Sequence, residues 1–336
     1  NPLAPAKEGN DLATLTYNKA LTQAKQSALN GVLAFTNDNH DEAFAKETKA
    51  SDMDAFSTGY NQALNGFTAA EINYLDAAHH DSDSYADQVY KEAAMAFKDV
   101  SGRTGQVKEN ATNDVDKSAY NKAFKEAFGI ANTGADDAVK GVPKDTNIDQ
   151  YAGKKALIDS YQAGYHDAKI AYSDAENDYT KANDHISDRN YDRVYRGAAL
   201  GFSDIINHQA GQNAKVDSNK AFVDAYNIAS QQASVQAHNG AMDANGPNQS
   251  RQFNTNVDKK AYEVGYNDAN NSYSAAQENP DDKSRSGLTN SGLAYAGAAA
   301  AFNDVADDNL GHSKFVSSDM VYQNAYDKAL AEGKQN

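Results

Sequence analysis

Histidine and aspartate residues that stand next to each other could hold a divalent cation. His79 and His80 are followed by Asp81 and Asp83, and imidazole and carboxylate groups are common metal ligands. A metal site needs ligands that converge from separate turns, and the matched segment later in the chain, residues 278–286, contains no histidine. We therefore predict no metal site and no cofactor. We interpret His79, His80, His208 and His238 as residues at helix C-termini, where they interact favourably with the helix dipole.

The stretch from Asp81 to Glu92 also places acidic residues at several of the positions used by a helical calcium loop. The sixth position of such a loop requires glycine for its sharp turn, and this chain has Ala86 there. The residues that follow already have a helical pattern. We therefore predict no calcium site.

No set of residues with the spacing of a catalytic site is found. The sequence contains no Gly-x-Ser-x-Gly motif and no glycine-rich phosphate loop. Its carboxylates are scattered over polar faces without an evident pair in an apolar setting. Because repetition is more typical of fibres and multivalent binders than of enzymes, we predict that the protein is not an enzyme.

Tyrosine rings could instead stack on sugars. Three tyrosines, Tyr85, Tyr151 and Tyr191, lie at or before predicted helix starts. Together with His79 and His80 they are the candidate ligand contacts. The many other tyrosines recur at helical spacing, which predicts buried rings with hydroxyl groups near solvent.

The elements that carry these residues are predicted to be helices with a heptad seam, a narrow stripe of residues spaced alternately by four and three. In residues 161–179 the seam runs Tyr, Tyr, Ala, Tyr, Ala, Tyr, and residues 56–74 and 262–276 repeat it. Such a stripe must be buried against other helices. Strand patterns are absent, so the fold class is predicted to be all-α.

Three helix types follow one another in a fixed order. The first type begins at Tyr17 and recurs after 103, 102 and 100 residues; the second begins at Phe56 and recurs after 105 and 101. The third type is the segment 89–100, which recurs at 194–205 and 294–305. A repeat of about 100 residues predicts tandem units that each bury a core.

We predict three tandem three-helix units and one extra C-terminal helix. An extended tail at 1–11 precedes unit 1 at 12–102, unit 2 at 114–208 and unit 3 at 215–308, and 317–336 forms a single helix of a truncated fourth unit. Separate coiled-coil-like bundles are one arrangement. A continuous α-solenoid, in which each helix packs on neighbours of the adjacent unit, is the alternative.

Short motifs predict where individual helices start and stop. Val115-Asp116 and Val257-Asp258 precede seam aromatics, which predicts an aspartate N-cap with the valine just outside the helix. The pair Asn239-Gly240 predicts a helix end.

Composition excludes several classes of partner. The 336 residues include 31 basic and 47 acidic side chains, for a net charge of -16, so nucleic acid and anionic membrane surfaces would be repelled. The absence of cysteine excludes disulfides and thiolate sites. No apolar run approaches the roughly 18 residues that span a bilayer, so we predict no membrane insertion.

The Tyr-x-x-Gly-Tyr-x-x-Ala helices, the acidic polar faces rich in Asn and Ala, and the missing cysteine resemble repeat regions of large cell-surface proteins of lactobacilli and related Gram-positive bacteria. The resemblance implies an exported protein, attached to the cell wall through parts outside this fragment. It implies an adhesin or stalk that contacts host glycan, mucin or matrix protein, or a bacterial cell-wall component. A helical scaffold that docks a partner protein or peptide in a groove is the alternative.

Overall fold

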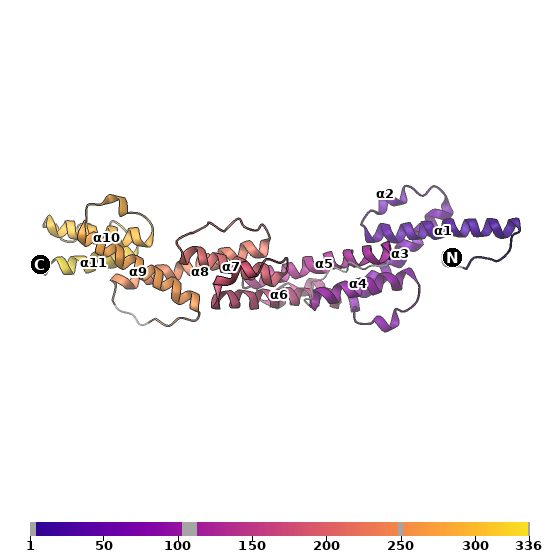
Figure 1. Ribbon diagram of the computed structural model, residues 1–336, viewed down its shortest axis with the longest axis horizontal. Coiled ribbons are helices and arrows are strands. Elements are labelled where there is room, and N and C mark those ends of the chain that lie inside the picture. The colour runs from indigo at the N-terminus through magenta and orange to yellow at the C-terminus, as the bar shows by residue number, and fades with distance from the viewer. Residues whose placement is uncertain (1–4, 103–112, 248–250, 335–336) are drawn as a thin grey trace. The chain divides into compact units, whose positions relative to one another are not determined.

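The computed structural model describes residues 5–102, 113–247 and 251–334, and all regular elements within these ranges are helices (Figure 1). The all-α prediction is therefore confirmed. The α-helices are α1 (Leu12–Thr36), α2 (His40–Phe44), α3 (Ala50–Asn73), α4 (Tyr85–Ser101), α5 (Asp114–Val139), α6 (Lys155–Asn177), α7 (Asn190–Ile206), α8 (Lys220–Asn245), α9 (Asn256–Glu278), α10 (Asn290–Ala306) and α11 (Met320–Gly333). Short 3-10 helices are η1 (Ala77–His79), η2 (Lys144–Thr146), η3 (Ile148–Tyr151), η4 (Tyr179–Asp184) and η5 (Lys283–Arg285).

The helix types predicted from the sequence are all present in the described ranges. The first type forms α1, α5, α8 and α11, the second forms α3, α6 and α9, and the third forms α4, α7 and α10. The short helix α2 is an addition between α1 and α3 that the sequence patterns did not indicate.

Two helices begin earlier than predicted. The N-cap of α5 is Asn113, whose side chain accepts a hydrogen bond from the Asp116 N–H, and the N-cap of α9 is Thr255. Val115 and Val257 therefore lie inside the first turn, where both are buried. The prediction of an aspartate N-cap was wrong because an asparagine or threonine three residues upstream already supplies the capping oxygen.

The helix end predicted at Asn239-Gly240 was also wrong. Helix α8 continues through this pair to Asn245, so His238, predicted at a helix C-terminus, lies inside the helix, where its Nδ1 is 3.0 Å from Asn290 Oδ1. Gly240 is instead a packing residue, because a Cβ placed there would lie only 2.0 Å from the Tyr262 carbonyl oxygen of α9.

The same close approach joins every first-type helix to the second-type helix that follows it in the described ranges. Each partner contributes one glycine, and a Cβ on either glycine would meet a carbonyl oxygen of the other helix at 1.8–2.1 Å. The glycine pairs are Gly31 with Gly59, Gly134 with Gly164, and Gly240 with Gly265. Only glycine permits backbones to approach so closely, so these residues fix where the two helices cross.

Two of the third-type helices, α7 and α10, pack in a similar way against the next first-type helix. A Cβ on Gly197 of α7 would lie 2.4 Å from the Phe222 carbonyl oxygen of α8, and one on Gly297 of α10 would lie 2.2 Å from the Tyr322 carbonyl oxygen of α11. Small side chains on the third-type helix thus make room for the aromatic side chains of its partner.

The chain divides into two compact units, Asn1–Asp167 and Ala168–Asn336, with the division inside α6. Within the first unit α4 packs against α5, and within the second α7 packs against α8 and α10 against α11. These contacts cross the borders of the repeats taken from the sequence, because each joins a third-type helix to the first helix of the following repeat.

Two hydrophobic cores each combine four helices of matching types. One is built from the end of α1, the second half of α3, α4 and α5 as far as Ala131, and it also reaches Ala156 and Leu157 at the start of α6; the other is built from the end of α8, the second half of α9, α10 and α11.

Of the seam tyrosines, Tyr161 and Tyr273 are buried, as predicted, and Tyr165 and Tyr172 are half-buried. The hydroxyl groups of the two buried tyrosines have carboxylate partners that the sequence did not identify. Tyr161 donates to Asp137 Oδ2 at 2.7 Å and Tyr273 to Glu332 Oε2 at 2.8 Å.

Candidate functional site: a lysine-lined groove beside α1 and α5

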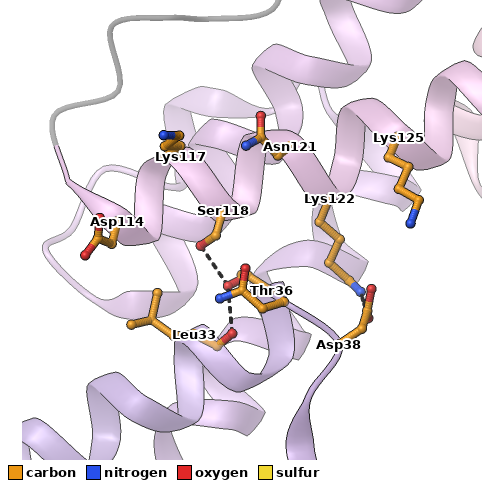
Figure 2. A pocket seen from close by; sticks show the side chains of 10 residues that line it. Leu33, Thr36, Asp38, Asp114, Lys117, Ser118, Asn121, Lys122 and Lys125 are labelled. Atoms are coloured by element: carbon orange, nitrogen blue, oxygen red, sulfur yellow. Dashed lines mark hydrogen bonds and ion pairs between the residues drawn. The ribbon is translucent and has the colours of Figure 1, made fainter.

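A polar groove of about 450 Å³ lies in the first unit, where the end of α1 meets the first half of α5 (Figure 2). From α5 it is lined by Asp114, Lys117, Ser118, Asn121, Lys122 and Lys125. These positions are three or four residues apart, so they form one stripe along the helix. The seam on the neighbouring face, which includes the buried Ala119 and Ala123, holds α5 in the core and keeps this stripe outside it.

Two hydroxyl groups tie the walls of the groove together. Thr36 Oγ1 on the last turn of α1 lies 2.8 Å from Ser118 Oγ on α5, and Figure 2 shows these side chains meeting between the two helices. Leu33 is the apolar side chain of this wall. The groove thus combines a polar floor with a row of amino groups above it.

The three lysines have different surroundings. Lys122 forms an ion pair with Asp38, and its Nζ lies 4.9 Å from the centre of the Phe35 ring. The side chain of Lys122 is only 18 % exposed. Lys117 and Lys125 are exposed, and within the described residues neither forms an ion pair. Figure 2 shows Lys125 extending on the same side of α5 as Lys122, with Lys117 along the outer edge.

A pair of glutamates close to this groove was missed in the sequence. Glu71 on α3 is 6 % exposed and accepts a bond from Lys154 Nζ at 2.9 Å. Burial, together with the negative charge of Glu71 and a hydrogen bond with it, raises the pKa of Glu126 on α5 to about 7; Lys154 and Lys122 act in the opposite direction. Both glutamates are next to buried alanines in sequence, but only the packing of α3 beside α5 brings them together.

Among the candidate ligand contacts, His80 takes part in a loop contact in front of α4. Its Nδ1 lies 2.9 Å from Asp87 Oδ1, and its ring stacks on Tyr90 with 3.6 Å between ring centres. In the next repeat His185 and Asp192 make the same contact at 2.8 Å. The spacing His-x-Ser-x-x-x-x-Asp occurs at both places in the sequence and could have indicated this structural contact.

His79 is exposed and bonded to Asp76, and this hydrogen bond raises the pKa of His79. The three candidate tyrosines are not open platforms. Tyr85 and Tyr151 are partly buried against the core of the first unit, and the Tyr191 hydroxyl donates to Asp174 Oδ2 at 2.6 Å. The described contacts do not gather these candidates into one site, and their role in ligand binding stays a prediction.

Two features are absent from the part of the chain that the structure describes, a cluster of metal ligands and a membrane-spanning helix. No three histidine, aspartate or glutamate side chains gather in a geometry that could hold a metal ion. None of the described helices combines the length and the apolar character that crossing a membrane requires.

Comparison of the whole chain with models of protein families, with curated proteins and with solved structures finds no match.

Proposed function

We propose that this chain is a non-catalytic repeat segment of a bacterial cell-surface protein. It acts outside the cell as a stalk or an adhesin, through multivalent contact with host glycan, mucin or matrix protein, or with a bacterial cell-wall component. The observation that carries the proposal is the helix crossing with reciprocal glycines, which occurs in every repeat. The same helix crossing recurs in three repeats, which is typical of a protein built from tandem structural units.

Sharing of helices between repeats supports the same conclusion. Within the second unit α8 packs against α7 through Phe222 and against α9 through Gly240. One continuous helix therefore belongs to two packing arrangements, and no flexible linker separates them. A shared helix transmits force between successive repeats, which is what a stalk requires.

The packing across repeat borders favours the solenoid form of the predicted architecture over three separate bundles. We propose that each first-type helix closes the core of the preceding repeat with its first half and begins the next with its second half. Both cores combine the end of one first-type helix with the start of the next, which supports this assignment. The tandem repeats at 12–102, 114–208 and 215–308 are then units of sequence rather than of packing.

The net charge of -16 limits the partners we propose. Nucleic acid would be repelled over most of the surface, and an acidic surface keeps a secreted protein soluble. We therefore propose that the partners are polymers of the host surface or the cell wall, which are either uncharged or bound at one local site on the protein.

The test is saturable binding of the chain to immobilised mucin, matrix proteins and bacterial cell wall at pH 5 and pH 7. Saturable binding to one of these surfaces is expected if the repeats are adhesive. If none binds, the adhesive form fails and the stalk is tested by single-molecule stretching, where we expect unfolding events that recur at a regular contour length. Irregular events at low force would contradict the stalk as well.

A second candidate function, a helical scaffold that docks a partner protein or peptide, is favoured by one observation: the groove between α1 and α5. Its lining contains a single apolar side chain, Leu33, whereas helices and peptides dock through several apolar anchors. We therefore place this candidate second.

A further inference from the structure

The groove beside α1 and α5 is formed by helices whose types recur along the chain, but its row of lysines does not recur with them. At the positions that match Lys117, Lys122 and Lys125, the later first-type helices have other residues. These are Asn219, Asp224 and Asn227 in α8, and Asp319, Asn324 and Asp327 at the start of α11. In α1 the matching residues are Thr14, Lys19 and Thr22. The complete row of three lysines is therefore a property of α5 alone, and repeat packing does not explain it.

The corresponding place in the second unit is closed. Asn324 of α11 donates its Nδ2 to the Met242 carbonyl oxygen of α8 at 2.9 Å, and Lys328 Nζ lies 3.1 Å from Asn245 Oδ1. The short amide thus bonds directly to the end of the neighbouring helix. In the first unit, by contrast, Lys122 reaches outward to Asp38 and leaves the space beside it open.

We propose that the groove between α1 and α5 binds an acidic oligosaccharide, carboxylated or sulfated, along the lysine stripe of α5. Lys117 and Lys125 are eight residues apart and so about 12 Å apart along the helix, a spacing that suits an extended chain with an acid group near each end. Between them the exposed Asn121 offers an amide group, which matches the hydroxyl groups of sugars, whereas the hydroxyl groups of Ser118 and Thr36 are already bonded to each other.

The composition of the groove argues against two other occupants. It contains no arginine, and arginine is the residue that holds a compact phosphate or carboxylate in a fixed bidentate geometry. Lysine is a flexible point charge, better suited to an extended and mobile polyanion. A peptide would require apolar anchors, and Leu33 is the one apolar lining residue.

The charge of the whole protein gives such a site selectivity. The groove lining carries three lysines against two aspartates, Asp38 and Asp114, and Asp38 is paired with Lys122. On a protein with net charge -16, this small local excess of positive charge is where a polyanion is repelled least. Binding through exposed lysines is screened by salt, so the affinity must fall as ionic strength rises. This inference deepens the adhesive form of the proposed function and rests on it.

The experiment is a calorimetric titration of the full chain with each probe, which measures the affinity in about 20 mM and about 150 mM salt. A heparin-derived hexasaccharide is the sulfated probe, a galacturonate hexamer the carboxylated probe, maltohexaose the neutral control and hexaglutamate the peptide control. The test variant carries Lys117→Gln and Lys125→Gln. The matched control carries Lys19→Gln and Lys91→Gln, which remove the same charge at exposed positions outside the groove.

We expect saturable binding of an acidic hexasaccharide and no binding of maltohexaose. The affinity for the acidic hexasaccharide should be roughly tenfold lower in the groove variant, because two exposed ion contacts are removed. In the control variant this affinity should be unchanged. The sulfated and carboxylated probes decide which acid group is preferred. Equal weakening in both variants, tighter binding of hexaglutamate, or no saturable binding would overturn the proposal. Binding to immobilised mucin, matrix proteins and cell wall is measured separately. If the groove variant still binds one of these surfaces, the proposal for the groove is overturned and the adhesive function is not.

Discussion

At the scale of single residues, buried carboxylates anchor the loops that follow the third-type helices. Asp204 is fully buried and accepts hydrogen bonds from the Asn213 N–H at 2.9 Å and the Tyr226 hydroxyl at 2.5 Å. Asp304 repeats the arrangement with Tyr326 at 2.6 Å. Burial and the bond to Asp204 raise the pKa of Tyr226 to about 12, so each tyrosine remains a hydrogen-bond donor throughout the physiological pH range. These carboxylates are structural, because their acceptor sites are already used by the loop and the next helix.

Glu126 differs from these carboxylates because its negative charge is unfavourable in the fold. Its pKa rises from 4.5 to about 7, so between these values the folded protein binds more protons than the unfolded chain, and stability falls as pH rises through this window. Replacing Glu126 by Gln removes the charge but keeps a polar partner for Glu71. We expect the variant to be more stable than the parent at pH 8, by on the order of 1 kcal/mol after solvent screening.

The measurement is urea unfolding followed by circular dichroism at pH 4.5 and pH 8. The gain should be absent at pH 4.5, where Glu126 is protonated in the folded state. Glu8→Gln, at an exposed position, is the control and should show no gain at either pH. An equal gain at both pH values would mean that the charge of Glu126 is not the cause.

At the scale of elements, the relative positions of paired helices are determined by the points at which their backbones come into contact. In each crossing the glycine of the first-type helix faces the carbonyl oxygen of a seam aromatic, such as Phe56 in α3 or Tyr161 in α6, and the glycine of the second-type helix faces the carbonyl oxygen of an alanine. The aromatic ring then fills the space beside the crossing, and alanines along the seam keep the helices close. A glycine in a helix interior costs conformational entropy, so its presence at these positions indicates that packing gains exceed that cost.

Helix α5 contains a matched pair of glycines that tests this explanation. A Cβ on Gly134 would lie 2.1 Å from the Tyr161 carbonyl oxygen, whereas a Cβ on Gly129 would meet no atom within 4 Å. We expect Gly134→Ala to destabilise the protein by about 1 to 3 kcal/mol through overpacking. Gly129→Ala should stabilise it by about 0.5 to 1 kcal/mol through helix propensity.

Thermal and urea unfolding of the two variants, side by side with the parent, provide the measurement. Both variants carry the same substitution in the same helix. The informative result is therefore that the free energy of unfolding falls in Gly134→Ala and rises in Gly129→Ala. If Gly134→Ala were as stable as Gly129→Ala, the crossing of α5 and α6 would not depend on backbone contact.

At the scale of the whole molecule, two compact units carry a large excess of negative charge. Most of the ion pairs are on the surface, where each contributes little. Self-repulsion among the remaining acidic groups opposes the folded state. The stability of the entire protein should therefore respond to ionic strength more strongly than any single ion pair would suggest.

We expect the melting temperature at pH 7 to rise when salt is increased from about 10 mM to about 300 mM, because screening weakens the repulsion. At pH 5, near the isoelectric point of about 4.8, the same change of salt should have little effect. Differential scanning calorimetry at both pH values measures the difference. A melting temperature that falls with salt at pH 7 would show that favourable ion pairs outweigh the repulsion.

The sequence by itself determined the all-α class and the order of the helices, because the four-three spacing of tyrosine and alanine requires a buried helical stripe whatever the partner is. It also predicted that the rings of Tyr161 and Tyr273 would be buried, whereas the carboxylate partners of their hydroxyl groups came from the tertiary structure. Only the tertiary structure decided which stripes meet. The roles of Gly240 and Glu126 could not be predicted, because both depend on a helix distant in sequence that approaches within contact distance. The lysines of α5 likewise become a groove only beside the end of α1, since pairing of helices is set by the fit of backbones and side chains in three dimensions and not by local periodicity.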